Sequence, residues 1–364
     1  MKVVFSSDVF ELQRFGGISR YFVEIASRIN LLPGFQTKIA TASHINSYLS
    51  KSSVNSGLYI PFSPNRVRVN KLMRVTNKIY SQSIGSKGYF DIRHETFYRG
   101  NIEYIKACKS VTTVYDLIRE KFTPGWEGFQ AKQKALARAD AIICISENTA
   151  SDLRSFYDVN PDKVSVIYLG VNSDFEKFRK TSEMKRDSNQ FLYVGARDNY
   201  KDFKTLIWAF ASSRILRENS RVLVFGNEFS KEELGLLNKF GIRKNFYHRK
   251  GNDFSLMNAY NDSIALVITS QYEGFGLPLI EAMISGCIVV SSRGGALAEI
   301  GGDLDIPFEV SNPESLAYSL ESILSRIGTL EPLRELSYRH ALKFTWEKTV
   351  EDTISVYRNL LSNV

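Results

Sequence analysis

Two carboxylates eight residues apart, Glu273 and Glu281, enclose a glycine-rich turn whose chemistry suits a polar ligand. The run 263–270 before the turn is apolar and has the length of a buried strand. Pro278 stands where a first helical turn favours proline, and residues 279–285 read as helix. A helix N-terminus attracts anions, and carboxylates accept hydrogen bonds from hydroxyl groups. The pattern fits a ligand with both features, such as a sugar nucleotide; the alternative is a tight turn whose acid only stabilises the helix.

Arg197 and Lys201 form a second candidate group, between the strand-like run 191–195 and a helix-like run that begins at Asp202. Cations are disfavoured at a helix N-terminus, so two of them indicate that an anion completes the site. The alternative is that both side chains are solvated and that Asp202 alone caps the helix.

Runs typical of strands alternate with runs typical of helices, and this order predicts a parallel α/β architecture around these residues. A length of 364 residues predicts two domains. The stretch 175–189 is dense in charged residues and poor in apolar ones, which predicts an interdomain linker. Strands are expected at 3–7, 37–42, 90–92, 110–115, 141–145, 163–167, 191–195, 221–225, 245–248, 264–269 and 287–291, and helices at 18–29, 70–84, 202–216 and 346–361.

The glycine-rich stretch resembles the Glu-x7-Glu signature of retaining glycosyltransferases of family 4, which have the GT-B fold. The resemblance implies two Rossmann-like domains whose parallel sheets face each other across a cleft. It implies an acceptor domain over 1–172, a linker over 173–189, a donor domain over 190–345 and a final helix, 346–364, that crosses back to the first domain. The matching positions are Ser270, Gly274, Phe275, Gly276, Pro278, Glu281, Ala282, Met283 and Gly286.

The resemblance also implies roles for donor-binding residues. Glu281 would accept hydrogen bonds from ribose hydroxyls, and Glu273 would contact the transferred sugar. The backbone amides around Gly274, Phe275, Gly276 and Leu277 would approach the sugar or the phosphate. Arg197 and Lys201 would hold the diphosphate and stabilise its departure without a metal ion.

The first half of the chain holds further candidates. The resemblance places the Gly16–Gly17 turn over the donor phosphates. Tyr115 and Asp116 stand where many family members carry His-Asp, so a histidine role is in doubt, whereas Asp116 would orient a sugar hydroxyl or the acceptor. His94 follows another strand end and either lines the cleft or is a buried histidine with satisfied hydrogen bonds.

We expect no metal, because Arg197 and Lys201 would stabilise the departing diphosphate instead, and no cofactor, because the sugar nucleotide is a substrate. Asp303-Leu304-Asp305 has the Asp-x-Asp form of a metal site, but it follows two glycines and is expected to be an exposed turn. Three scattered cysteines indicate reduced thiols in the cytosol, and the four scattered histidines do not favour a structural zinc site.

The net charge of +8 is concentrated in residues 25–90, which hold nine lysines and arginines and no acid. Residues 70–84 can form an amphipathic helix. Its basic side indicates contact with an anionic membrane surface. The alternatives are a helix packed on its own domain with a solvated basic rim, and nucleic-acid binding, for which no recognised motif is present. The apolar stripe would consist of Leu72, Val75 and Ile79, with Lys71, Arg74 and Lys78 beside it.

The resemblance predicts a cytoplasmic retaining glycosyltransferase, either free or peripheral on the inner face of the cytoplasmic membrane. It would move a sugar, with GDP-mannose as the expected donor, to a saccharide or lipid-linked acceptor in surface polysaccharide or glycolipid synthesis. The alternatives are another GT-B chemistry such as sugar-nucleotide epimerisation, and a non-catalytic, membrane-associated sugar-nucleotide binding protein in which Tyr115 marks lost activity.

Overall fold

The computed structural model describes residues 1–61, 67–87, 89–99, 101–181, 189–197 and 199–362. The chain divides into two compact units. Unit 1 joins Met1–Gly170 to Trp346–Val364, and unit 2 is Val171–Thr345. Within the described residues, no helix combines the length and apolar character needed to cross a bilayer.

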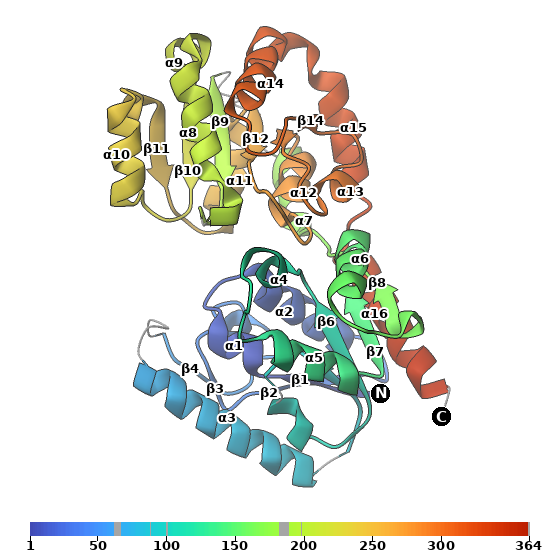
Figure 1. Ribbon diagram of the computed structural model, residues 1–364. Coiled ribbons are helices and arrows are strands. Elements are labelled where there is room, and N and C mark those ends of the chain that lie inside the picture. The colour runs from blue at the N-terminus through green and yellow to red at the C-terminus, as the bar shows by residue number, and fades with distance from the viewer. Residues whose placement is uncertain (62–66, 88, 100, 182–188, 198, 363–364) are drawn as a thin grey trace. The chain divides into compact units, whose positions relative to one another are not determined.

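Unit 1 is built on a six-stranded parallel sheet in the order β2-β1-β5-β6-β7-β8. The strands read as apolar runs because helices cover a parallel sheet on both faces. β3 (Ser43–His44) and β4 (Leu58–Tyr59) form a separate pair (Figure 1). The sheet strands are β1 (Lys2–Ser6), β2 (Gln36–Ala40), β5 (Phe90–Glu95), β6 (Ala107–Val114), β7 (Ala141–Cys144) and β8 (Val164–Val166).

The helices of unit 1 follow the apolar periodicity of the sequence. Phe22, Ile25 and Ile29, at helical spacing in α2, are all buried. The last helix, α16, belongs to this unit although it ends the chain, and its Tyr357 bonds to His94 of β5. The helices are α1 (Asp8–Leu12), α2 (Gly17–Asn30), α3 (Val67–Lys87), α4 (Ile118–Phe122), α5 (Phe129–Arg138), α6 (Glu147–Phe156) and α16 (Trp346–Ser362), with short 3-10 turns at Leu49–Lys51, Asn101–Tyr104 and Pro161–Lys163.

Unit 2 repeats this design, with a six-stranded parallel sheet in the order β11-β10-β9-β12-β13-β14. The chain adds β10 and β11 on one side of β9 and then returns to the other side with β12. The parallel α/β prediction is therefore confirmed in both units. The strands are β9 (Gln190–Val194), β10 (Arg221–Phe225), β11 (Phe246–Arg249), β12 (Ala265–Ile268), β13 (Ile288–Ser291) and β14 (Ile306–Pro307).

The helices of unit 2 depart from the sequence prediction at Ser213 and within the expected linker. The helix expected over 202–216 is broken at Ser213, because the Ser213 hydroxyl accepts from the Leu216 N–H at 3.0 Å and starts a new helix. Residues 173–181 of the expected linker form α7, whose Phe175 is buried, while 182–188 lie outside the described residues. The helices are α7 (Ser173–Thr181), α8 (Phe203–Ser212), α9 (Arg214–Asn219), α10 (Lys231–Lys239), α11 (Asp253–Asp262), α12 (Leu277–Ile284), α13 (Leu297–Gly301), α14 (Pro313–Ser325) and α15 (Glu331–Ala341), with 3-10 turns at Asn199–Lys201, Arg243–Asn245 and Ile327–Thr329.

Candidate functional site

The strand order of unit 2 reverses between β9 and β12, and the best candidate site lies where these strands end. In open parallel sheets, ligands bind outside the carboxyl ends of the strands at such a switch point. Lys201 follows β9, and Glu273 follows β12. The topology therefore brings to one sheet edge a cation and an acid that are 72 residues apart in the sequence.

Lys201 and Glu273 form a close ion pair at this edge, with 2.6 Å between Nζ and Oε1. The Ser270 hydroxyl donates to the same carboxylate oxygen at 2.6 Å. Two further bonds join the loops that carry the pair: the Gln271 N–H donates to the Tyr200 carbonyl oxygen at 2.7 Å, and the Thr269 hydroxyl donates to the Lys201 carbonyl oxygen at 2.6 Å. The two loops that carry the pair are thus tied to each other, and 21% of the lysine and 16% of the glutamate side chain are exposed.

The glycine turn that follows Glu273 is required by backbone geometry. Gly276 caps the N-terminus of α12 with φ 93°, a left-handed conformation that side chains disfavour. A Cβ atom at Gly276 would also lie 2.7 Å from Cδ2 of Leu297. The sequence pattern of turn followed by helix is confirmed, and α12 begins at Leu277, one residue before Pro278.

A second glycine turn, formed by Gly294 and Gly295 after β13, contacts the backbone of Glu273. The sequence analysis did not predict this turn. Gly295 pairs with Glu273 in a parallel bridge, and the Glu273 N–H donates to the Gly294 carbonyl oxygen at 3.2 Å. A Cβ atom at Gly295 would lie 2.4 Å from the Glu273 carbonyl oxygen. The Gly294-Gly295 dipeptide shortly after the strand predicted at 287–291 was the available signal, because close backbone approach favours glycine.

Glu281 lies on α12 and is largely buried, with 7% of the residue exposed. Its Oε2 accepts a hydrogen bond from the Tyr260 hydroxyl of α11 at 3.1 Å. Tyr260 thereby fixes the carboxylate on α12. The predicted role of Glu281 towards ribose hydroxyls stays a prediction.

Arg197 is engaged differently from Lys201. Its guanidinium donates to both carboxylate oxygens of Glu233, at 2.5 and 3.1 Å, and to the carbonyl oxygens of Asn227 and Glu228, at 3.0 and 2.7 Å. Burial raises the pKa of Glu233, but the hydrogen bonds and charge of Arg197 and the bonds of Ser230 lower it by more. The pKa of Glu233 is therefore below its ordinary value. In this structure Arg197 joins the loops after β9 and β10, and its role at a diphosphate stays a prediction.

His94 belongs to the core of unit 1. Its Nδ1 lies 2.6 Å from the Tyr357 hydroxyl and its Nε2 2.8 Å from the Thr113 hydroxyl. Burial lowers the pKa of His94 to about 3, so the ring is neutral. This geometry fits the interpretation of a buried histidine with satisfied hydrogen bonds and does not offer the ring to a ligand.

Tyr115 is also part of the core. Its hydroxyl donates to the Thr96 carbonyl oxygen at 3.3 Å, and burial raises its pKa well above the ordinary value. Asp116 is half-buried after β6, and one carboxylate oxygen accepts from the Ile118 N–H at 3.1 Å. Lys132 donates to the Asp116 carbonyl oxygen at 2.8 Å and so fixes this loop. The role of Asp116 towards an acceptor stays a prediction.

The Gly16–Gly17 turn caps α2. Gly16 has an extended backbone, and its carbonyl oxygen accepts from the Ser19 hydroxyl at 3.0 Å. Gln13 occupies the space beside it, because a Cβ atom at Gly16 would lie 2.3 Å from the Gln13 amide oxygen. The predicted approach of this turn to donor phosphates stays a prediction.

The Asp303-Leu304-Asp305 motif is only partly the exposed turn that the sequence predicted. The Asp303 side chain is 89% exposed, but that of Asp305 is fully buried, and both carboxylates pair with Arg293. The Ser291 hydroxyl also donates to Asp305. Within the described residues, no cluster of three or more potential ligand side chains is arranged to hold a metal ion.

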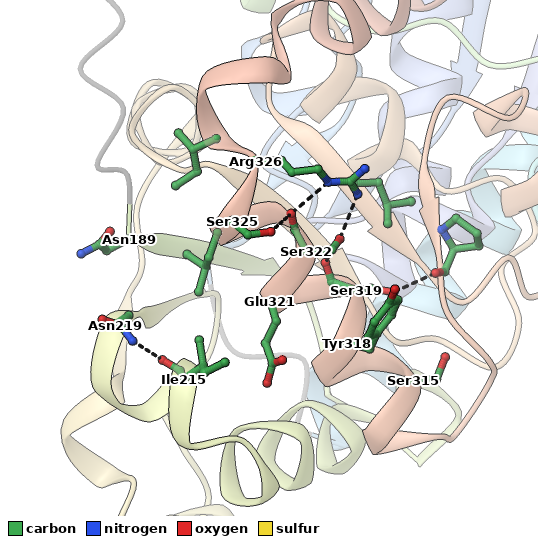
Figure 2. Close-up of a pocket in the computed structure, with 14 residues that line it drawn as sticks. Asn189, Ile215, Asn219, Ser315, Tyr318, Ser319, Glu321, Ser322, Ser325 and Arg326 are labelled. Atoms are coloured by element: carbon green, nitrogen blue, oxygen red, sulfur yellow. Dashed lines mark hydrogen bonds between the residues drawn. The ribbon is translucent and has the colours of Figure 1, made fainter.

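A hollow of about 930 Å³ opens elsewhere on unit 2, and Figure 2 shows its lining. Asn189 and Asn219 precede β9 and β10, so the hollow lies at the amino ends of the strands. Binding sites in this architecture form at the opposite edge. Many of its serines already bond within the protein, as when Ser319 donates to the Pro307 carbonyl oxygen at 2.9 Å. We therefore place the candidate site at Lys201 and Glu273.

Comparisons with known proteins cover nearly the whole chain. The family described as "Glycosyltransferase Family 4" matches residues 15–175, and "Glycosyl transferases group 1" matches residues 174–359. An MMP alpha-(1->4)-mannosyltransferase of Mycolicibacterium hassiacum is 29% identical over 256 residues, which cover 68% of this chain and 61% of that protein. The chain spans about three fifths of the length of the curated relatives that it matches first.

Solved structures share the fold over the full length of the chain. Sucrose-phosphate synthase of Thermosynechococcus elongatus has a TM-score of 0.77 at 18% identity, with 100% of each chain covered. HepE of Anabaena, solved with UDP and glucose, has a TM-score of 0.74 at 15% identity, also with 100% of each chain covered. These likenesses confirm the GT-B fold class. Because the two family matches together span residues 15–359, the chain belongs to the group 1 glycosyl transferases, with an amino-terminal half of the family 4 type.

Proposed function

We propose that the protein is a retaining glycosyltransferase that binds a nucleotide-diphosphate sugar at the switch point of unit 2. One observation carries this proposal: the Lys201–Glu273 pair, with 2.6 Å between charged atoms, at the edge where β9 and β12 end. Family membership supplies the reaction class, and the pair supplies the groups that a donor needs.

The ion pair would keep both charges ready for a donor. Lys201 and Glu273 neutralise each other in the structure. A bound diphosphate would attract the ammonium group of Lys201 away from Glu273. The carboxylate oxygens of Glu273 could then accept hydrogen bonds from sugar hydroxyls. Because both backbones are tied by the Tyr200 and Lys201 carbonyl bonds, this exchange needs only side-chain movement.

The proposed reaction needs no strong protein base. The bond between the anomeric carbon and the diphosphate oxygen breaks, and the electron pair leaves with the diphosphate. The acceptor oxygen forms the new bond to the anomeric carbon, and its proton passes to a diphosphate oxygen. Lys201 stabilises the negative charge that develops on the departing group, which is the role of a preorganised cation in a partly water-excluded site.

The donor is proposed from the relatives. The Mycolicibacterium relative is named as a mannosyltransferase, which supports GDP-mannose, whereas the HepE structure contains UDP and glucose. A thermal-shift series with GDP-mannose, UDP-glucose and a dTDP-sugar decides among them, because a ligand that binds only the native state stabilises it. The largest shift with GDP-mannose would support mannose transfer; a shift with UDP-glucose alone would contradict it.

We propose a saccharide or lipid-linked acceptor and a cytoplasmic location. The three cysteines are free thiols in the structure, which supports a reducing compartment. Surface polysaccharide or glycolipid synthesis is the process that these acceptors serve.

A transfer assay with matched variants tests the function. Lys201→Ala is expected to lower the transfer rate at least a hundredfold, on the scale of removing one charged group from the transition state. Lys204→Ala is the control, because this lysine lies three residues away and forms an exposed pair with Glu232. Equal activity of both variants would refute the role of Lys201, and product that forms without an added acceptor would favour epimerisation.

A further inference from the structure

The longest helix of unit 1, α3, exposes its apolar stripe. Leu72, Val75 and Ile79 are 65%, 48% and 59% exposed. The sequence left open a helix that packs on its own domain; the structure packs α3 on unit 1 through another face and leaves these three side chains exposed. Figure 1 shows α3 along the periphery of unit 1, beside β3 and β4.

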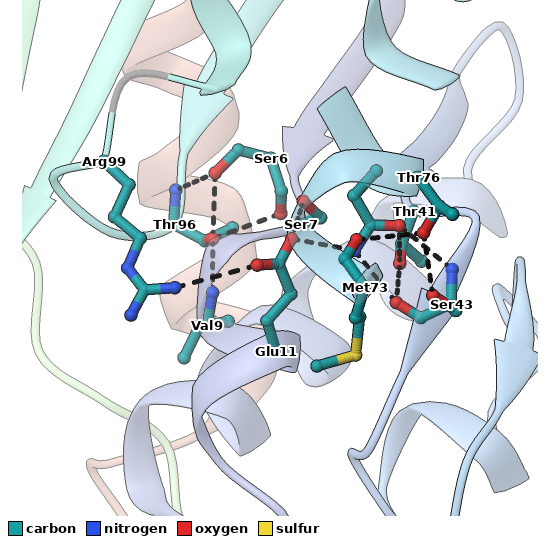
Figure 3. A network of polar contacts seen from close by, with 11 residues as sticks. Ser6, Ser7, Val9, Glu11, Thr41, Ser43, Met73, Thr76, Thr96 and Arg99 are labelled. Carbon is teal, nitrogen blue, oxygen red and sulfur yellow. Dashed lines mark hydrogen bonds and ion pairs between the residues drawn. The ribbon is translucent and has the colours of Figure 1, made fainter. Parts of the chain in front are cut away.

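A different face of α3 fixes the helix to unit 1. Met73, Asn77 and Ile84 are buried, at 2%, 0% and 7% exposure. The Asn77 amide donates to Glu11 Oε1 at 2.7 Å and to the Ser43 carbonyl oxygen at 2.9 Å. Its own oxygen accepts from the N–H groups of Ala42 and Ser43 at 2.7 and 3.0 Å. Figure 3 shows Met73 and Thr76 of α3 in the same network of polar contacts as Glu11 and Ser43.

The anchored helix therefore presents a rigid outer face. The inward face of α3 is held on unit 1 by packing and by the hydrogen bonds of Asn77. A rotation that buried Leu72, Val75 and Ile79 against unit 1 would break these contacts. A binding partner would bury these three side chains without the free-energy cost of rearranging unit 1.

Cations flank the exposed stripe on one side. Lys71, Arg74 and Lys78 are exposed, one to three residues from the stripe residues along the helix. The ion pairs found among the described residues do not include them, and Lys78 lies 5.2 Å from the centre of the Tyr104 ring, which is 41% exposed. The absence of acids from residues 25–90 leaves this charge uncompensated in the local sequence.

We propose that the outer face of α3 docks on an anionic lipid surface. A helix that lies in the interface inserts apolar side chains to the acyl boundary while lysine and arginine reach the lipid phosphates. The three apolar residues and the three cations of α3 have this arrangement. A nucleic acid would use the cations but would leave Leu72, Val75 and Ile79 in water, so the lipid surface fits the whole face better.

Vesicle co-sedimentation of the full chain tests the proposal. The probes are phosphatidylcholine vesicles with and without about 30 mol% phosphatidylglycerol, at about 50 and 500 mM salt. The wild type is expected to bind the anionic vesicles at low salt, and binding should fall at high salt because exposed charges are screened. Each cation near the surface contributes about fivefold, so Lys71→Gln, Arg74→Gln and Lys78→Gln together should weaken binding roughly a hundredfold.

A second variant separates insertion from charge. Leu72→Ser, Val75→Ser and Ile79→Ser together keep the net charge and should weaken binding about tenfold or more, because less apolar area is buried. The substituted side chains are exposed, so the variants should keep the wild-type thermal unfolding. The control for charge replaces Lys231, Lys239 and Lys244 by glutamine, and the control for apolar area replaces Ile215, Val310 and Leu336 by serine, all exposed on unit 2.

The controls should bind vesicles as the wild type does. Equal binding to neutral and anionic vesicles, or unchanged binding by both α3 variants, would overturn the proposal. Retention on duplex DNA with no retention on anionic vesicles would also overturn it. Because vesicle binding is measured without donor or acceptor, its failure leaves the proposed transfer activity unaffected.

Discussion

Acidification should destabilise unit 1 through His94, and glutamine at this position should remove that effect. The ring is 0% exposed and packs against Phe5 and Phe22, with centroids 5.5 and 5.3 Å away. Tyr357 and Thr113 hold its two nitrogens. No charged side chain is among these partners, so a proton on the ring would have no counterion in contact.

The direction of this pH effect follows from the pKa of His94 in the folded and in the unfolded protein. The pKa of His94 is about 3 in the native protein and 6.5 in the unfolded chain. Between these values the unfolded state binds the additional proton, so stability falls as the pH is lowered. By about pH 4 the shift corresponds to about 3 kcal/mol of lost stability.

The assay is urea unfolding at about pH 7, 5.5 and 4 in a Trp208→Phe background. Trp208 is the tryptophan of unit 2, so the remaining fluorescence comes from Trp126 and Trp346 of unit 1. His94→Gln should be less stable than the parent at neutral pH by about 1–3 kcal/mol, because its hydrogen bonds fit less well. That difference should shrink by about 3 kcal/mol at the lowest pH. A constant difference at all three pH values would refute the reasoning.

Two further predictions concern a buried acid and a strained glycine. Burial and then the nearby Glu11 raise the pKa of Asp8 from 3.8 to about 7, so its contribution to stability is present below pH 3.8 and is lost as the pH rises through 7. Asp8→Asn should therefore gain stability over the wild type between about pH 4 and 8, by up to about 4 kcal/mol in urea unfolding, and an unchanged gap would contradict this. Gly276→Ala should lower the free energy of unfolding by about 1–3 kcal/mol, because of φ 93° and the contact with Leu297, whereas Gly235→Ala, at a helical position with open space, should not lower it.

The sequence predicted the sheets well because parallel strands are buried on both faces. Runs such as 221–225 are continuous and apolar, and the structure reproduces this strand with the same bounds. The break at Ser213 was missed, because a serine within an apolar periodic run is also compatible with an uninterrupted helix.

The sequence predicted the conformation of the candidate site only where residues adjacent in the chain determine it. The turn from Glu273 to Gly276 is local, so its conformation follows from glycine and proline preferences. The partner of Arg197 is not local: Glu233 lies 36 residues away and meets it only through the packing of α10. The burial of Asp305 beside Arg293 and the outward orientation of the α3 stripe likewise depend on tertiary packing, which periodicity does not specify.

The binding of a nucleoside diphosphate to the full chain tests the central claim most directly. Isothermal titration with GDP and UDP should show Kd raised at least tenfold by Lys201→Met, because a charge-assisted contact to phosphate is worth about 1.5–3 kcal/mol, while Lys204→Met leaves it unchanged. The same Kd for both variants, for whichever nucleotide binds, would contradict the assignment of Lys201 as the cation that holds the donor diphosphate.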